Sequence, residues 1–165
     1  MKERGWGDVV VKPAISASAY RTWQTEGGVT PEDETRFRAM VMTGEVMVQP
    51  RLETLVAEGE WSFVFLGGEF SHAVLKRPAP GDFRVQTNLG GTVSRAEAPP
   101  KWVDQARAAL AVVQGPWLYA RVDGCMLDGQ FVLMELEMLE PDLFLNLEPG
   151  APARFADALM RLIKR

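Results

Sequence analysis

The stretch Tyr119–Pro141, YARVDGCMLDGQFVLMELEMLEP, decides the fold. Two apolar runs flank a central Asp-Gly pair, which is typical of a β-hairpin turn. Three carboxylates lie within these runs, at Asp123, Glu135 and Glu137. Glu135 and Glu137 are two residues apart, so on a strand their side chains leave the same face. Like charges held so close on a half-buried surface repel each other, which predicts a cation there, most naturally a hard divalent ion with oxygen ligands.

The register of the hairpin decides whether Asp123 joins the two glutamates. A three-residue loop with a glycine bulge places Asp123 opposite Glu135. A tight two-residue turn instead places Asp123 opposite Met134 and Val122 opposite Glu135. A slip of one residue turns every side chain to the other face of the sheet. The sequence leaves both registers open, and a further alternative is a hairpin whose glutamate face is simply solvated.

The composition bounds the class of protein. The 165 residues are 47% hydrophobic and 24% charged, which suffices for one globular domain with a real core or for two small lobes around a cleft. A net charge of -4, without a basic block, argues against nucleic-acid binding. No apolar run is long enough to span a bilayer, and residues 1–8 lack the apolar core of a signal peptide. The single cysteine excludes an internal disulfide and fits a reducing cytoplasm, so we expect a cytoplasmic protein.

The single histidine, His72, narrows the possible chemistry. A His-rich zinc site cannot be built within one chain, and Ser-His-Asp or Cys-His catalysis would have to use His72 alone. The residue lies in the strand-like run EFSHAVLKRP, so we expect a strand residue with a polar partner. Cys125 lies among apolar hairpin residues, which indicates a core residue rather than a nucleophile.

Strands and helices alternate along the rest of the chain. Strands are predicted at residues 9–11, 46–48, 61–66 and 70–75. Helices are predicted at residues 30–44, 101–114 and 152–165. Four apolar residues of the last helix are expected to face inward: Phe155, Leu159, Leu162 and Ile163. Residues 77–100 are rich in Gly and Pro and should be largely loop. Because the hairpins require antiparallel pairing, the predicted class is α+β.

Two lysines stand at strand ends. Lys12 follows three β-branched residues and precedes a loop of small residues that includes Ser16 and Ser18, and Lys76 ends a second strand in the same way. Such a loop lets backbone N–H groups approach phosphates. Each lysine alone fits a solvated edge residue. Together with the hairpin carboxylates, which could hold Mg²⁺, they are the parts of a magnesium–nucleotide site.

At this point the chain resembles the ATP-grasp superfamily, and within it glutathione synthetase and D-alanine–D-alanine ligase. The matching blocks run almost end to end: VVVKP, VQPRL, EGEWSFVFLGGEF, LKRP, DFRVQTNLGG, ARVDG and MELEMLEP. The last block is similar to the family's metal-binding strand, an acid-x-acid/Asn pair with a proline four residues on. The resemblance implies two α+β lobes with antiparallel sheets enclosing a nucleotide cleft. Residues 1–50 would form a partial small lobe, and residues 51–165 a larger lobe with the metal-binding hairpin.

The resemblance also implies roles in nucleotide binding. Lys12 and Lys76 would contact the ATP phosphates. The flexible loop over the phosphates, without the family's usual glycine, would comprise Ser16, Ala17 and Ser18. The adenine edge would be met by Gln49 and by the backbone of Arg51 and Leu52. Glu60 would bond the ribose hydroxyls, with an exposed turn acid as the alternative.

Further positions match the metal and reaction centres of the family. Asp123, Glu135 and Glu137 would hold two Mg²⁺ ions, with Mn²⁺ as an alternative ion. Glu137 stands where many relatives have Asn and adds a negative charge. Three residues match positions near the transferred phosphate and the reaction intermediate: Arg84, Asn88 and Arg121. The alternative for Arg84 is a solvated loop cation.

The chemistry implied by the resemblance is ATP-dependent ligation. ATP phosphorylates a carboxylate, and an amine then attacks the acyl phosphate, with catalysis mostly by positioning and charge stabilisation. The expected partners are therefore ATP, Mg²⁺ and small carboxylate and amine substrates of an amino-acid or peptide-like kind.

The N-terminal substrate domain of these ligases is missing here, because VVVKP begins almost at the first residue. We expect a fragment or a truncated product of a longer enzyme. The alternative is a non-catalytic nucleotide-binding or assembly module that needs a partner domain. A missing domain would leave apolar surface that favours a homo-oligomer.

Overall fold

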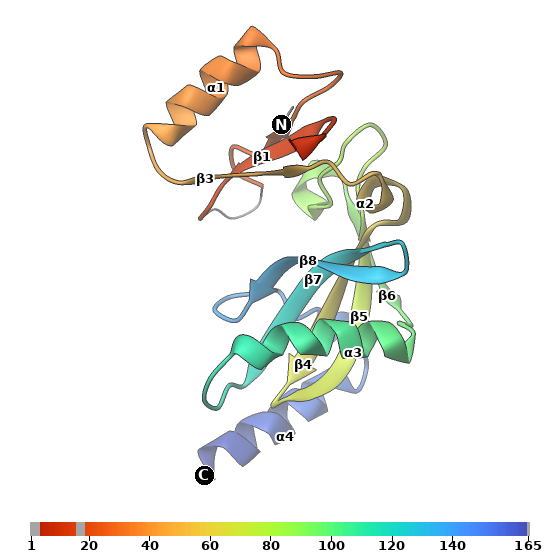
Figure 1. The fold of residues 1–165 in the computed structure, drawn as a ribbon. Helices are drawn as coiled ribbons and strands as arrows, with labels where there is room; N and C mark the ends of the chain where they lie inside the picture. Colours follow the sequence, from red (N-terminus) through yellow and green to blue (C-terminus); the bar gives the residue numbers. More distant parts are fainter. Residues whose placement is uncertain (1–3, 16–18, 165) are drawn as a thin grey trace. The chain divides into compact units, whose positions relative to one another are not determined.

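The computed structural model describes residues 4–15 and 19–164. It divides into two compact units, one ending at Glu53 and the other beginning at Thr54 (Figure 1). The predicted phosphate-covering residues Ser16, Ala17 and Ser18 lie outside the described residues. In the part of the chain that the structure describes, no helix is both long enough and apolar enough to cross a membrane.

The first unit is a small antiparallel sheet with one helix. Its three strands, in the order β2-β1-β3, are β2 (Trp23–Gln24), β1 (Val9–Pro13) and β3 (Val46–Pro50). The helix α1 (Pro31–Val41) begins at the predicted cap, where Thr30 and Asp33 form a reciprocal capping box. Its Met40 packs against the strand residues Val9 and Val11, and together they form the core of the unit.

The second unit is built on a five-stranded antiparallel sheet in the order β6-β5-β4-β7-β8. The strands are β4 (Glu60–Leu66), β5 (Glu69–Arg77), β6 (Thr92–Ala96), β7 (Tyr119–Leu127) and β8 (Gln130–Glu137). A short helix, α2 (Glu53–Glu58), leads into β4. The predicted α+β class, with antiparallel pairing of the two hairpins, is confirmed.

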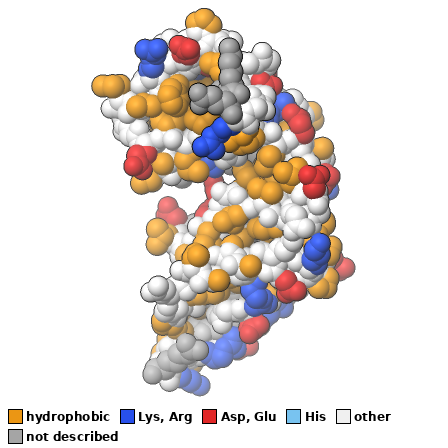
Figure 2. Space-filling model, in the orientation of Figure 1, with side chains coloured by type: hydrophobic (Ala, Val, Ile, Leu, Met, Phe, Trp, Pro, Cys, Tyr) orange, Lys and Arg blue, Asp and Glu red, His pale blue; other side chains and the backbone are white. Residues whose placement is uncertain are grey.

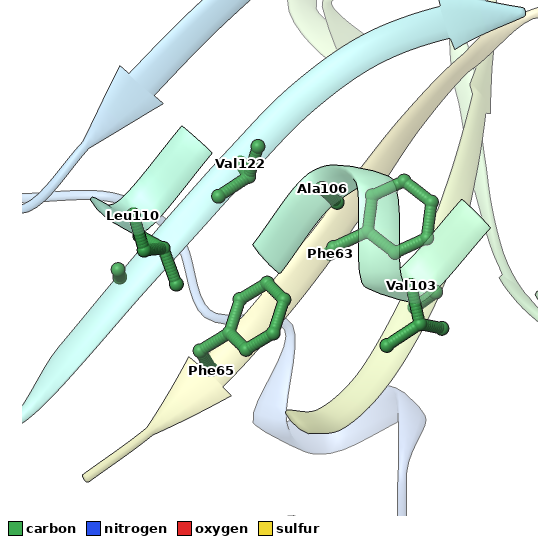
Figure 3. Close-up of a cluster of buried hydrophobic side chains, with 8 residues drawn as sticks. Phe63, Phe65, Val103, Ala106, Leu110 and Val122 are labelled. Carbon is green, nitrogen blue, oxygen red and sulfur yellow. The ribbon is translucent and has the colours of Figure 1, made fainter. Parts of the chain in front are cut away.

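One face of this sheet is covered by α3 (Pro100–Ala109), which a 3₁₀ turn extends through Val112. Figure 3 shows the side chains that meet there, with Val103, Ala106 and Leu110 on the helix and Phe63 among those on the strands. The Phe63 ring also packs edge-on against Phe131, with ring centroids 5.4 Å apart. Aromatic pairs in this geometry add to the hydrophobic stabilisation from burial alone, so this face is the main core of the unit.

The opposite face is covered at one end by α4 (Ala151–Ile163), but not by the residues predicted. Ala158 and Phe155 pack against the sheet, whereas Leu159 is 36% and Ile163 68% exposed. The cause is a close approach, because a side-chain carbon added at Gly67 would lie 3.1 Å from Ala158 Cβ. Only small residues fit there, so the buried stripe runs through alanines and two of the predicted inward residues face solvent.

The sequence patterns also missed four short elements. β2 has two residues, α2 has six, and β6 lies inside the segment 77–100 that was expected to be largely loop, as does a 3₁₀ turn at Thr87–Leu89. β6 pairs only with β5, at the edge of the sheet. Its residues TVSRA are half-buried or exposed, so it lacks the apolar alternation by which a strand is recognised.

The hairpin β7–β8 combines a two-residue turn with a β-bulge, and the sequence did not suggest this combination. Its turn has two residues, Asp128 and Gly129, both with positive φ, as a tight type I′ turn requires. Unbroken pairing from such a turn would set Asp123 opposite Met134. A β-bulge between Asp123 and Gly124 shifts the pairing, so that Asp123 lies opposite Glu135. The expected consequence of a two-residue turn was therefore wrong.

Gly124 makes this bulge possible. A side-chain carbon at this position would overlap the carbonyl oxygen of Val132 and the ring of Phe131. We expect Gly124→Ala to lower the free energy of unfolding by about 1–3 kcal/mol, as overpacking of a full core does. Urea unfolding followed by circular dichroism measures this loss. The matched control is Gly44→Ala, where an added carbon meets no atom within 4 Å; equal stability of the two variants would contradict the role given to Gly124.

Candidate functional site

Three carboxylates converge on the face of the second sheet that α3 does not cover. Val122 and Leu136 alternate with the acids along the strands and pack into the core under α3. Asp123, Glu135 and Glu137 therefore project from the other face, and one oxygen from each lies within 4.8 Å of the other two. Asp123 is fully buried, Glu137 is half-buried and Glu135 is exposed. Three clustered carboxylate oxygens are a donor set that suits Mg²⁺ or Ca²⁺.

Lys76 neutralises part of this charge. Its Nζ lies 2.7 Å from Asp123 Oδ2 and 2.8 Å from Glu60 Oε2, and all three side chains are buried. Burial raises the pKa of Glu60, and the nearby Asp123 acts in the same direction. Burial lowers the pKa of Lys76, but the carboxylates of Glu60 and Asp123 outweigh it, so the pKa lies above its ordinary value. Lys76 therefore stays charged at neutral pH and is held between two acids.

Arg121 holds the other side of Asp123. Its Nε donates to Asp123 Oδ1 at 2.9 Å, and its Nη2 donates to Glu137. Its Nη1 donates to the backbone carbonyl of Asp142 at 3.0 Å, and its guanidinium carbon lies 5.6 Å from the centroid of the Phe144 ring. Burial opposes the charge, but Asp123 outweighs it and the pKa of Arg121 is raised. The guanidinium is thus fixed on several sides.

Carboxylates outnumber cations among the described contacts of this cluster. The carboxylates are those of Glu60, Asp123, Glu135 and Glu137, and the cations Lys76 and Arg121 are ion-paired with Glu60, Asp123 and Glu137. Asp123 accepts hydrogen bonds from both cations, yet a carboxylate offers about four acceptor positions, so it can still bind an ion. A divalent cation bound to these oxygens would offset negative charge in the cluster.

A buried hydroxyl beside the acids supports the same view. Ser62 is paired with Asp123 across the β4–β7 ladder and is 0% exposed. Its hydroxyl has no hydrogen-bond partner among the described residues. Buried polar groups are usually satisfied by protein, water or a ligand, so this hydroxyl fits a site that holds water or an ion. The alternation of Glu60 and Ser62 along one strand could have indicated it from the sequence.

The other predicted residues of the second unit are placed as follows. Glu60 is only 7% exposed, so the alternative of an exposed turn acid is wrong. Arg84 lies in the loop after β5 and forms a two-pronged ion pair with Asp82, with Nη2 2.8 Å from Oδ2. Hydrogen bonds from Arg84 lower the pKa of Asp82 to about 2. Arg84 is therefore ion-paired rather than simply solvated, and Asn88 lies exposed in the Thr87–Leu89 turn.

The remaining predicted residues belong to the first unit. Lys12 is a half-buried residue of β1, opposite Met47 of β3. Gln49 lies on β3, opposite Val10. Arg51 and Leu52 follow that strand, and Arg51 is ion-paired with Glu53 at 2.8 Å. The structure thus brings together Glu60, Lys76, Arg121, Asp123, Glu135 and Glu137, all in the second unit.

Comparisons with known proteins agree with this arrangement. No protein-family model matches the chain. The cycloserine biosynthesis protein DcsG of Streptomyces lavendulae is 29% identical over 135 residues, which is 77% of this chain and 45% of that protein. The crystal structure of D-cycloserine synthetase DcsG matches with a TM-score of 0.82 and 25% identity, over 96% of this chain and 56% of that one. The chain has the ATP-grasp fold.

Other ATP-grasp ligases match in fold alone. D-alanine–D-alanine ligase from Bacillus anthracis, in complex with ATP, matches with a TM-score of 0.69 and 16% identity, over 99% of this chain and 53% of that one. The ATP-grasp ligase PsnB, with Mg and ADP, matches with a TM-score of 0.64 and 18% identity, over 95% of this chain and 49% of that one. The resemblance to the ATP-grasp superfamily, and within it to D-alanine–D-alanine ligase, is confirmed. The chain spans about half the length of the proteins that it matches.

Because Asp123 is buried and Glu135 is exposed, substitutions of these two acids should change the free energy of unfolding by different amounts. We expect Asp123→Asn to lower the free energy of unfolding by about 3–5 kcal/mol, because Lys76 and Arg121 then lose a shared buried partner. Glu135→Gln should change it by less than about 1 kcal/mol, because an exposed charge contributes little. Chemical denaturation of both variants tests this, and a larger loss for Glu135→Gln would contradict the geometry.

Proposed function

We propose that this chain is the nucleotide-binding portion of an ATP- and Mg²⁺-dependent ligase that joins a carboxylate to an amine. The convergence of Asp123, Glu135 and Glu137 beside Lys76 and Arg121, on an ATP-grasp scaffold, carries this proposal. The relatives that match are ligases, including a D-cycloserine synthetase and D-alanine–D-alanine ligases. In the proposed organisation, residues 1–50 are the small lobe and residues 51–165 the larger lobe.

The acids of the hairpin would hold Mg²⁺. Asp123, Glu135 and Glu137 offer oxygen ligands for one ion at one place, and a second ion would also be held by the nucleotide phosphates. When bound, Mg²⁺ neutralises phosphate charge and orients the phosphate chain. Lys76 keeps the Asp123 carboxylate in place, so that the acid is available as a ligand.

Arg121 is the residue of this cluster best suited to stabilise the reaction. It is anchored to Asp123 and Glu137, so its charge is positioned in advance near the acids, and such preorganisation is a large source of catalysis. In the proposed reaction the substrate carboxylate oxygen attacks the γ-phosphorus of ATP and ADP leaves. The amine then attacks the acyl carbon, phosphate leaves and the amine loses a proton. Arg84 and Asn88 are proposed to act near the same phosphate.

Nucleotide contacts are proposed for residues of the first unit and for Glu60 of the second. Lys12 would bind phosphate, and Gln49 with the Arg51 and Leu52 backbone would meet adenine, while Glu60 would bond the ribose. In the structure Glu60 forms an ion pair with Lys76. For Glu60 to bind the ribose while Lys76 binds a phosphate, the two side chains would have to share their hydrogen-bonding capacity between each other and the nucleotide. Ser16 and Ser18 would contact the phosphates from the covering loop.

The substrates are proposed by class. The relatives that match include D-alanine–D-alanine ligases, which are named for an amino acid, and the macrocyclase MdnC, whose structure contains the precursor peptide MdnA. We propose a small carboxylate and an amine of one of these two kinds, and a cytoplasmic enzyme. ATP turnover by the chain with a panel of amino acids and peptides separates this proposal from a non-catalytic module, which would bind Mg-ATP without turning it over.

Binding of Mg-ATP tests the site directly. We expect isothermal titration to show Mg-ATP binding to the wild-type chain, weakened at least about tenfold in Glu135→Gln, since loss of a metal-holding group typically costs that much affinity. Glu69→Gln, which changes an exposed acid at the far end of β5, is the matched control and should bind as the wild type does. Equal affinity of all three proteins would remove the metal site from the proposal.

A further inference from the structure

His72 lies at the end of a chain of hydrogen bonds that the proposed reaction does not use. Its Nε2 lies 3.0 Å from the backbone carbonyl oxygen of Leu143, and its Nδ1 lies 2.9 Å from Ser71 Oγ. A carbonyl only accepts, so the neutral ring carries its proton on Nε2 and donates it to Leu143. Nδ1 is then the acceptor for the Ser71 hydroxyl. The predicted strand histidine with a polar partner is confirmed.

The series of hydrogen bonds that begins at His72 continues to two charged residues, Arg154 on α4 and Glu148 just before that helix. Ser71 Oγ accepts a hydrogen bond from Arg154 Nε at 3.0 Å. Arg154 is ion-paired with Glu148, whose other oxygen lies 2.6 Å from Arg95 Nε of β6. The hydroxyl of Ser71 is therefore oriented by Arg154 on one side and His72 on the other. This leaves His72 with a single orientation, aimed at Leu143.

The segment that His72 holds is the one that supports Arg121. Asp142 supplies the carbonyl that accepts from Arg121 Nη1, and Phe144 supplies the ring next to the guanidinium. Leu143 lies between them. The segment belongs to no helix or strand, and its inner bond joins Phe144 N to Asp142 Oδ1 at 2.8 Å.

The backbone of this segment needs an external hold. Phe144 has a φ of 49°, in the left-handed region that costs a residue other than glycine roughly 1 kcal/mol or more. Such a conformation persists only where surrounding contacts fix it. Besides its contacts with Arg121, the segment is tied to the sheet by the bond from His72 to the Leu143 carbonyl and by the packing of the Leu143 side chain against Val64 and Leu66.

We propose that His72 is a positioning residue for Arg121: by holding the Leu143 carbonyl, it fixes the Asp142–Phe144 segment that supports the guanidinium. The link to catalysis rests on the proposed function, but the link to the geometry of Arg121 does not. The chain of contacts runs from β6 and α4, through β5, to a residue on β7 that binds two of the three clustered acids.

The charge state of His72 should matter to this arrangement. Burial lowers the pKa of His72 below its ordinary value of 6.5, and the positive charge of Arg154 acts in the same direction, against Leu143 and Glu148. A folded-state pKa below the unfolded value means that the unfolded chain binds more protons. The stability due to the neutral ring is therefore complete above pH 6.5 and is lost as the pH falls towards the folded-state pKa.

This pH dependence has a direct check. We expect the free energy of unfolding of the wild type to fall as the pH is lowered below 6.5, and the fall to be smaller in His72→Gln, which cannot bind that proton. Equal slopes in the two proteins would show that His72 is not held neutral. No other histidine is present in the chain to mask the effect.

The positioning role is tested by observing Arg121 itself. Nuclear magnetic resonance of the ¹⁵N-labelled chain gives the exchange rate of the Arg121 Nε–H proton, assigned by its absence in Arg121→Lys. We expect His72→Leu, which loses the donor, to raise this rate at least about tenfold through local opening. His72→Gln keeps a donor for the Leu143 carbonyl and should stay close to the wild type. An unchanged rate in His72→Leu would overturn the proposal.

A matched control separates positioning from general loosening. Val103→Ala removes core volume from α3 on the opposite face of the sheet and should destabilise the unit without raising the Arg121 exchange rate. An equal rise in Val103→Ala would overturn the positioning role.

Where the wild type turns over ATP, we expect His72→Leu to lower kcat about 10- to 100-fold with a smaller change in KM for ATP, and His72→Gln to restore kcat. Altered Arg121 exchange in a chain that binds no Mg-ATP would support the positioning role and count against the proposed function alone.

Discussion

The buried carboxylate of Asp123 is the constraint on which the second unit depends. A single unpaired carboxylate at this depth would be too costly to keep ionised. Lys76 and Arg121 make it tolerable, and each is in turn paired with a further acid, Glu60 or Glu137. The result is a buried network that links β4, β5, β7 and β8. Such a network leaves the sheet little freedom to shift register, because any slip would separate charges that are already out of water.

One face of the second sheet forms the hydrophobic core, and the other face carries the charged cluster. Under α3 the face carries a cluster of buried apolar and aromatic side chains, which stabilises the unit. On the other face, α4 covers one end with Phe155 and Ala158, and the charged cluster occupies positions on the same side of the strands. The alternation of side chains along β7 makes this possible, since Val122 enters the core while Asp123 and Arg121 project to the site.

Much of this was predictable from particular residues. The Asp-Gly turn, the Thr30 cap and the spacing of Glu135 and Glu137 each act locally, so the sequence alone revealed the hairpin, the helix start and the shared face. The bulge was beyond reach, because it depends on the tight contact of Gly124 with Val132 and Phe131 across the sheet. The inward face of α4 was misjudged for a similar reason, since only the folded chain brings Gly67 against Ala158. The support of Arg121 by a backbone carbonyl of Asp142 leaves no trace in residue types.

The bulge beside Gly124 also divides the hairpin into two segments of separate register. Between the turn and Gly124 the strand register is set by the two-residue turn. From Asp123 towards Tyr119 the register is shifted by one residue, and the ion pairs of Asp123 and Glu137 hold it. A bulge fixes register where it occurs. Changes at the tip are therefore insulated from the acids, and this hairpin should tolerate evolutionary drift and loop engineering at the exposed residues 127–130 while its carboxylates stay aligned.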